Sequence, residues 1–371
     1  MKRKVLLLTH DMSFSGAPKM MLLLWEEIKK KYHYDIDVIS LTNQGYYKDR
    51  FRELSHNFYL FKDINKSVSL NFIERINEKI FKLKKKSSQN QFFEKISNEN
   101  YDFIFANTIV TLPLAFQLKS NFSKLILNVH ELDTVLEEFL PNIIDYESKI
   151  DLVIVPSQLN LTLLEKKGIS GEKIKIVRDC STLEVKKNNF FAIEEDVFRV
   201  LGCGAAYWRK GDDLFIQLAK KVKGLNPKIK FYWVGPHSSE RKRVNCADRL
   251  KLNLEDTLFF LDEIELSNLL PEVHLFALTS REDPFPLAAV EAGMVGLPIT
   301  CFRNATGISE VITDDLIADY LDIDQMANII IDLFNDKSKY KIESDKNRNT
   351  FQKFETKTIA SEVVAIINDL L

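Results

Sequence analysis

The chain is poor in the residues that mark several classes of protein. Of its 371 residues only 4 are cysteine, 10 proline and 12 glycine, which excludes a disulfide framework, a collagen-like repeat and a linker-like sequence. The cysteines are far apart, with no Cys-x-x-Cys pair, as is typical of reduced thiols in a cytosolic protein. No apolar run approaches the roughly 18 residues of a membrane-spanning helix. Because the 51 Lys and Arg nearly balance the 53 Asp and Glu, bulk charge also argues against nucleic-acid binding.

The N-terminus resembles a secretion signal only in outline. Met1–Lys4 is basic and Val5–Leu8 is apolar, but four apolar residues are fewer than the roughly 7–15 that a signal peptide needs. We therefore expect a cytoplasmic protein.

Short apolar runs alternate with segments of helical spacing along the whole chain. Such alternation predicts parallel sheets with helices on both faces. The runs expected to form strands are residues 5–8, 36–41, 103–106, 125–129, 152–155, 198–202, 230–234, 257–261, 275–279 and 298–301. The expected helices include residues 19–31, 212–223, 286–295, 323–336 and 353–371.

The pattern lapses over Val185–Asp196, a charged stretch without strong periodicity, and then restarts. The sequence therefore predicts an α/β protein of two doubly wound parallel-sheet domains in series. Open parallel sheets bind ligands beyond the carboxyl ends of their strands. We expect function in the loops that begin at Thr9, Asn128, Gly202 and Thr279, facing a cleft between the domains.

The segment from Thr279 to Pro298 is the richest in candidate chemistry. Asp283 is suited to cap the following helix, and backbone N–H groups at a helix start bind phosphate well. Glu291 lies eight residues later, about 12 Å further along roughly the same helix face. This spacing suits the two ends of a nucleotide sugar, whereas a glycosidase pair would face each other across a bond. A capped helix with one buried Glu paired elsewhere remains the structural alternative.

A second candidate is the loop Gly202–Gly211, which follows a predicted strand. A dinucleotide fingerprint fails there because Tyr207 stands where a third glycine belongs. Arg209 and Lys210 are placed to stabilise a departing diphosphate, unless they form a solvated surface pair.

Two loops of the N-terminal half complete the candidates. Gly16 and Ala17 lie in a small-residue turn that allows close approach of a phosphate, or is an ordinary tight turn. His130 and Glu131 follow a predicted strand, where a lone His is either structural or catalytic.

Together these motifs resemble the family-4 retaining glycosyltransferases of GT-B fold, most strongly over residues 198–312. The family's Glu-x7-Glu pattern is matched by EDPFPLAAVE, its diphosphate-binding Lys-Gly by Lys210-Gly211, and its strand-end His by His130. The glycine loop is matched by residues 15–17 and the Gly-x-x-Glu by residues 307–310. Asp283 stands in the first Glu position, with Glu282 one residue too early, and Ala205 replaces a frequent Arg.

The resemblance implies a GT-B fold of two Rossmann-like domains: residues 1–190 for the acceptor, 191–353 for the nucleotide sugar, and a helix of residues 354–371 crossing back. It implies a retaining transfer of a sugar from a nucleotide-diphosphate sugar to a saccharide or lipid-linked saccharide in surface-polysaccharide synthesis. No cofactor or divalent metal is expected. A nucleotide-sugar epimerase or hydrolase, or a non-catalytic partner subunit of a transferase, remains an alternative.

The same resemblance assigns the site residues. Glu291 would bind ribose, Asp283 or Glu282 the sugar hydroxyls, and His130 the sugar near the reacting carbon. The diphosphate would contact Arg209, Lys210 and the backbone N–H groups of Phe285–Leu287, with Gly16 and Ala17 approaching it. The full set is His130, Arg209, Lys210 and Asp283 as catalytic residues; Gly16, Ala17, Glu282, Pro284, Phe285, Pro286, Leu287 and Glu291 for the donor; and Glu131 for the acceptor.

The first 100 residues are basic, with 19 Lys and Arg against 12 Asp and Glu. This balance is typical of a solvated helix face or of a surface that meets anionic lipid. We expect peripheral contact with an anionic membrane through Lys82–Lys86, at the inner face of the cytoplasmic membrane.

Overall fold

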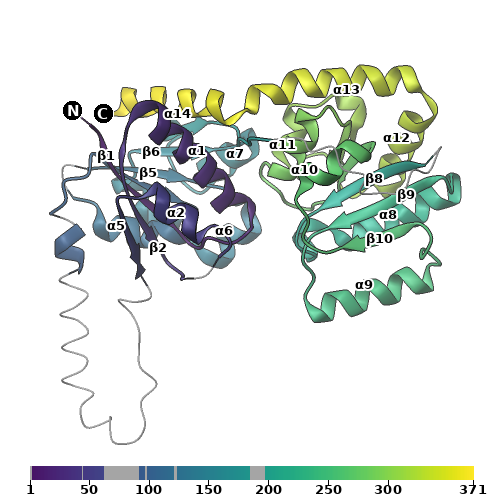
Figure 1. Ribbon diagram of the computed structural model, residues 1–371, viewed down its shortest axis with the longest axis horizontal. Helices are drawn as coiled ribbons and strands as arrows, with labels where there is room; N and C mark the ends of the chain where they lie inside the picture. The colour runs from purple at the N-terminus through teal and green to yellow at the C-terminus, as the bar shows by residue number, and fades with distance from the viewer. Residues whose placement is uncertain (1, 44, 62–91, 97, 121–122, 184–196) are drawn as a thin grey trace, which may run out of the picture. The chain divides into compact units, whose positions relative to one another are not determined.

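The computed structural model describes residues 2–43, 45–61, 92–96, 98–120, 123–183 and 197–371. The chain divides into two compact units, which we call the N-terminal domain (residues 1–155, 160–177 and 360–371) and the C-terminal domain (156–159 and 178–359). Each domain is built on one fully parallel sheet, as Figure 1 shows. The boundary predicted near residue 190 falls outside the described residues.

The N-terminal sheet has seven strands in the order β3-β2-β1-β4-β5-β6-β7. Its strands are β1 (Lys4–Thr9), β2 (Asp35–Ser40), β3 (Asn57–Leu60), β4 (Phe103–Asn107), β5 (Lys124–Asn128), β6 (Leu152–Val155) and β7 (Ile174–Ile176). The helices include α1 (Gly16–Tyr32), α2 (Lys48–Leu54), α5 (Leu112–Leu118), α6 (Asp133–Phe139) and α7 (Gln158–Lys166).

The central strands are apolar except at their ends, and both faces of this sheet are covered. In β1, Leu6 and Leu8 join one buried cluster with residues of α5 and β5. The opposite face is covered by α1, where the buried Trp25 contacts Phe103 and Phe105 of β4. Continuous apolar runs of this kind are the signature of parallel strands buried on both sides.

The C-terminal sheet has six strands in the order β10-β9-β8-β11-β12-β13. They are β8 (Phe198–Cys203), β9 (Ile229–Val234), β10 (Leu258–Leu261), β11 (Leu275–Leu278), β12 (Ile299–Phe302) and β13 (Ile317–Ala318). Its helices include α8 (Asp212–Leu225), α9 (Ser239–Lys251), α10 (Leu266–Leu269), α11 (Leu287–Met294), α12 (Ile323–Asn335) and α13 (Lys337–Phe351). Apolar residues of α8 and α12 pack on one face of the sheet.

The last helix, α14 (Thr356–Leu370), is shared between the domains along its length. Residues 360–371 group with the N-terminal domain, where Lys31 Nζ of α1 donates a hydrogen bond of 3.0 Å to Ser361 Oγ. No helix within the described parts of the chain is long and apolar enough to cross a bilayer.

Both sheets have the doubly wound strand order in which the winding reverses beside the first strand. The reversal lies between β1 and β4 in the N-terminal sheet and between β8 and β11 in the C-terminal sheet. Ligands of such sheets bind at the carboxyl ends of the strands at this point. The fold therefore directs attention to the loops after these four strands.

Candidate functional site

The loop after β8 ends in a short 3-10 helix, Trp208–Lys210, that presents two cations. Gly211 follows with φ of 70°, and a Cβ at this position would overlap the Thr279 carbonyl oxygen. This left-handed glycine lets the chain turn at once into α8, which starts at Asp212. Gly211 is therefore needed to place Lys210 directly before α8, in the loop that follows β8.

Lys210 and Arg209 both reach the loop after β11. Lys210 Nζ lies 2.5 Å from Asp283 Oδ2, and Arg209 Nη1 lies 3.7 Å from Asp283 Oδ1. Arg209 is also held by Tyr207, whose hydroxyl oxygen accepts from Nε at 2.8 Å, and by the Glu282 carbonyl at 2.9 Å. Burial disfavours the charged guanidinium, but the Asp283 carboxylate and Tyr207 outweigh it and raise the pKa of Arg209. The buried carboxylate and the two half-buried cations form one ion cluster.

Asp283 does not cap α11, and that prediction is wrong. The helix begins at Leu287, its N-cap is Pro286, and no side chain caps it. Asp283 instead lies in the preceding loop, where its N–H donates to the Ala305 carbonyl at 2.8 Å and its carboxylate turns to Lys210. The two carboxylates therefore do not share a helix face, because only Glu291 is on the helix.

The start of α11 supplies fewer amide donors than the sequence suggested. Pro286 has no N–H group, so only Phe285 and Leu287 of the predicted three can donate. The Phe285 ring is buried against Phe354, with Arg178 over its face. Pro284, also buried, has its carbonyl bound by the Gly307 N–H at 2.8 Å. These contacts hold the loop that leads into α11.

Glu291 is buried in α11, with 2% of its surface exposed, and Ser181 Oγ donates to its Oε1 at 2.8 Å. This contact agrees with the structural alternative of a buried, paired Glu. Binding of ribose by Glu291 stays a prediction.

Glu310, matched to the family's Gly-x-x-Glu, has three partners in the C-terminal domain. Its carboxylate accepts from the N–H groups of Gln158 at 3.1 Å and Leu159 at 3.3 Å, and pairs with Arg178 at 2.8 Å. Two of these partners lie over 150 residues away in the sequence, which no local pattern reveals.

Gly16 is the first residue of α1 and follows the loop after β1. A Cβ added to Gly16 would meet nothing within 4 Å, so the chain itself does not require glycine there. The Ala17 carbonyl accepts from Asn107 Nδ2 at 3.3 Å, which ties this turn to the end of β4.

His130 belongs to a polar cluster at the carboxyl ends of β4 and β5. Its Nε2 lies 2.7 Å from Asn128 Nδ2 and 3.2 Å from Asn107 Oδ1. Glu131 Oε2 accepts the backbone N–H groups of His130 at 2.9 Å and Ile109 at 3.4 Å. Glu131 thus fixes the loop that carries His130, and its binding of an acceptor stays a prediction.

His10, after β1, is one residue of this cluster that the sequence motifs did not single out. Its Nδ1 lies 3.4 Å from the Thr108 hydroxyl, and Nε2 lies 3.4 Å from Asp11 Oδ1. Burial lowers the pKa of His10, the Asp11 carboxylate opposes this, and His130 lowers it further. Thr108 has φ of 77°, an unusual conformation for a β-branched residue. Strain of this kind gathers at functional sites, but it is visible only in the folded backbone.

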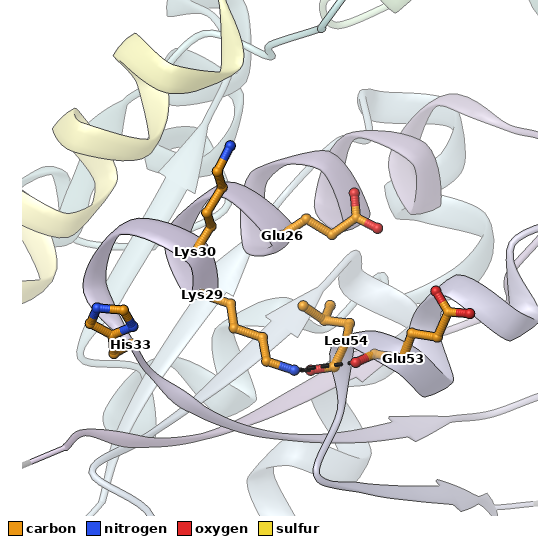
Figure 2. A pocket seen from close by; sticks show the side chains of 6 residues that line it. All are labelled: Glu26, Lys29, Lys30, His33, Glu53 and Leu54. Atoms are coloured by element: carbon orange, nitrogen blue, oxygen red, sulfur yellow. Dashed lines mark hydrogen bonds between the residues drawn. The ribbon is translucent and has the colours of Figure 1, made fainter.

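A separate depression of about 390 Å³ lies in the N-terminal domain between α1 and α2. Figure 2 shows Lys29 reaching across it, where Nζ donates to the Leu54 carbonyl at 2.7 Å and the Glu53 carbonyl at 3.2 Å. None of the predicted site residues lines it. Among the residues that the structure describes, no group of three or more His, Cys, Asp or Glu could hold a metal ion. Lys82–Lys86, the predicted membrane contact, lie outside the described residues.

The chain is similar to known proteins in sequence and in fold. Residues 185–350 match the family model "Glycosyl transferases group 1". Over its full length the chain resembles the crystal structure of Anabaena Alr3699/HepE in complex with UDP and glucose, with a TM-score of 0.77, 18% identity and 99% of both chains covered. The fold is therefore GT-B, as the sequence predicted.

Two curated sequences are similar over part of their length. One belongs to the phosphatidylinositol N-acetylglucosaminyltransferase of Arabidopsis thaliana and is 25% identical over 155 residues, 41% of this chain and 34% of the relative. The other, an uncharacterized 41.2 kDa protein in the cps region of Klebsiella pneumoniae, is 26% identical over 175 residues, 45% of this chain and 46% of the relative. The chain thus matches less than half the length of each.

Proposed function

We propose that this chain, a group 1 glycosyltransferase of GT-B type, is a retaining enzyme. It transfers a sugar from a nucleotide-diphosphate sugar to a saccharide or lipid-linked saccharide. The half-buried ion cluster of Lys210, Arg209 and Asp283 is the observation that carries the proposal. It lies within the part that matches the family model, at the carboxyl ends of β8 and β11 where the winding reverses.

The chemistry of this cluster suits a departing diphosphate. Cations fixed in advance stabilise the negative charge that develops on the leaving phosphate, and burial strengthens their effect. Asp283, or its neighbour Glu282, would accept hydrogen bonds from the sugar hydroxyls, and Glu291 from the ribose. The acceptor would attack from the face that the phosphate leaves, with the phosphate taking its proton. This route needs no divalent metal.

The N-terminal domain would supply the acceptor side of the reaction. His130 would contact the sugar near the reacting carbon, and Glu131 would hold the loop that positions His130. Gly16 and Ala17 would approach the diphosphate. Surface-polysaccharide synthesis at the cytoplasmic face of the membrane is the proposed setting, and the relative in a cps region supports it. Anionic lipid would bind through Lys82–Lys86, tested by binding of charge-reversed variants to anionic liposomes.

The first test is calorimetry with UDP, GDP and their sugar conjugates, with and without EDTA. Glu291→Gln keeps the shape of the side chain and removes its charge. We expect at least a tenfold loss of affinity for the nucleotide, about 1.4 kcal/mol. The matched control is Glu343→Gln, because Glu343 is also buried and hydrogen-bonded but belongs to α13.

Loss of binding on adding EDTA would contradict metal independence. Equal affinity of Glu291→Gln and the wild type would contradict the ribose assignment. Product analysis with the donor alone separates the remaining possibilities, because an epimerase or hydrolase converts the donor without an acceptor. Donor binding without turnover on any acceptor would favour a non-catalytic partner of a transferase.

A further inference from the structure

The proposed diphosphate site already holds a negative charge supplied by the protein. Asp283 Oδ2 is 2.5 Å from Lys210 Nζ and 3.3 Å from Ser280 Oγ, while Arg209 Nη1 faces Oδ1 at 3.7 Å. The side chains of Lys210 and Asp283 are only 16% and 6% exposed. In the free protein, the Asp283 carboxylate is therefore already paired with the cations that would bind a diphosphate.

The three members of the cluster differ in how firmly they are held. Arg209 is fixed by the Tyr207 hydroxyl and the Glu282 carbonyl. The backbone of Asp283 is fixed by its bond to Ala305. Lys210 instead ends in an ammonium group on a flexible stem, whose methylenes lie beside Gly204. Lys210 is the member that can change partner.

We propose that Asp283 competes with the ligand's diphosphate for Lys210, so that the site favours an intact nucleotide sugar over its nucleoside diphosphate product. This inference rests on the proposed function. A nucleotide sugar brings hydroxyl donors that replace Lys210 on the carboxylate. A nucleoside diphosphate pairs with Lys210 but supplies no hydrogen-bond donor to Asp283. A buried carboxylate is then left beside another anion. After the sugar has been transferred, Asp283 pairs with Lys210 again and the nucleoside diphosphate is released.

The test compares UDP with UDP-glucose, or GDP with GDP-mannose, on wild type and Asp283→Asn, using whichever pair the wild type binds. Asparagine keeps the size of the side chain and removes the charge. We expect Asp283→Asn to bind the diphosphate about tenfold more tightly. We expect the nucleotide sugar to bind no more tightly than before. The ratio of the two dissociation constants should therefore change by about tenfold or more.

Asp213→Asn is the matched control, since it makes the same charge change about one turn away from Lys210 at a carboxylate that pairs with Arg281. It should leave both affinities unchanged. Thermal unfolding verifies folding, and Asp283→Ser repeats the test with a second neutral side chain.

Two results would overturn the proposed competition between Asp283 and the diphosphate. Unchanged diphosphate affinity in Asp283→Asn, or equal tightening of diphosphate and nucleotide sugar, would overturn the competition. If the wild type binds no nucleotide or nucleotide sugar, the donor-site proposal fails first and this inference falls with it.

Discussion

Asp212 holds the start of α8 to α9, and replacing it with alanine should destabilise the C-terminal domain. Its side chain is fully buried and accepts from Arg241 Nε at 2.6 Å, Arg241 Nη2 at 2.8 Å and Asn245 Nδ2 at 2.6 Å. Alanine leaves Arg241 Nε and Asn245 Nδ2 without this acceptor, while Arg241 Nη2 keeps Asp213 Oδ1 at 3.5 Å. Removing one partner of a buried ion pair costs about 3–5 kcal/mol. Because Arg241 is 27% exposed and water can reach it, we expect the lower end, about 3 kcal/mol.

The neighbouring carboxylate provides the control for this prediction. Asp213 receives two hydrogen bonds from Arg281, at 2.9 and 2.8 Å, but its side chain is 39% exposed. An exposed pair contributes about 0–1 kcal/mol, so Asp213→Ala should cost no more than that. Urea unfolding followed by tryptophan fluorescence measures both variants, since Trp208 and Trp233 lie in the C-terminal domain. Equal losses below about 1 kcal/mol in the two variants would refute the argument from burial.

Three further predictions concern backbone space and pH. Gly211→Ala should destabilise by about 1–3 kcal/mol because Gly211 has a positive φ and a Cβ there would overlap a carbonyl oxygen. Gly224→Ala, with open space inside α8, should stabilise by up to about 1 kcal/mol, and thermal unfolding distinguishes the two variants. Gly16→Ala should fold normally and lose transferase activity, and normal activity would mean that no ligand approaches there. His274 Nδ1 accepts the Arg199 N–H at 3.0 Å, and burial followed by the Arg199 charge lowers the pKa of His274. Stability from this group is complete above pH about 6.5 and is lost as the pH falls, so His274→Asn should flatten that part of an unfolding-against-pH profile.

The parts of the fold that depend on local apolar pattern were predictable. Val5–Leu8 and Leu152–Val155 are short apolar runs typical of strands covered on both faces, and they lie in β1 and β6. Helix α9 was missed because it is mostly polar. Arg241 and Asn245 bind it to Asp212, so ion pairing takes the place of an apolar stripe.

The site was predictable in its members but less so in its geometry. Lys210 and Asp283 were both selected from the sequence, yet local rules made Asp283 a helix cap. Its partner, the half-buried Lys210 ammonium, lies 73 residues away in the sequence, where no local rule looks for it, and α11 takes Pro286 as its N-cap. His10 and Thr108 were missed because their signals are a strained φ and a contact between strand ends, which exist only after folding.

The division of the chain bears on how the protein is made. Since residues 360–371 belong to the N-terminal domain, that domain is discontinuous in sequence. On the ribosome its sheet can assemble early, but the segment that carries Ser361 emerges only after the whole C-terminal domain. The N-terminal domain therefore remains incomplete until the C-terminal domain has been translated. Deletion of residues 360–371 would damage a domain whose sheet is translated before the C-terminal domain.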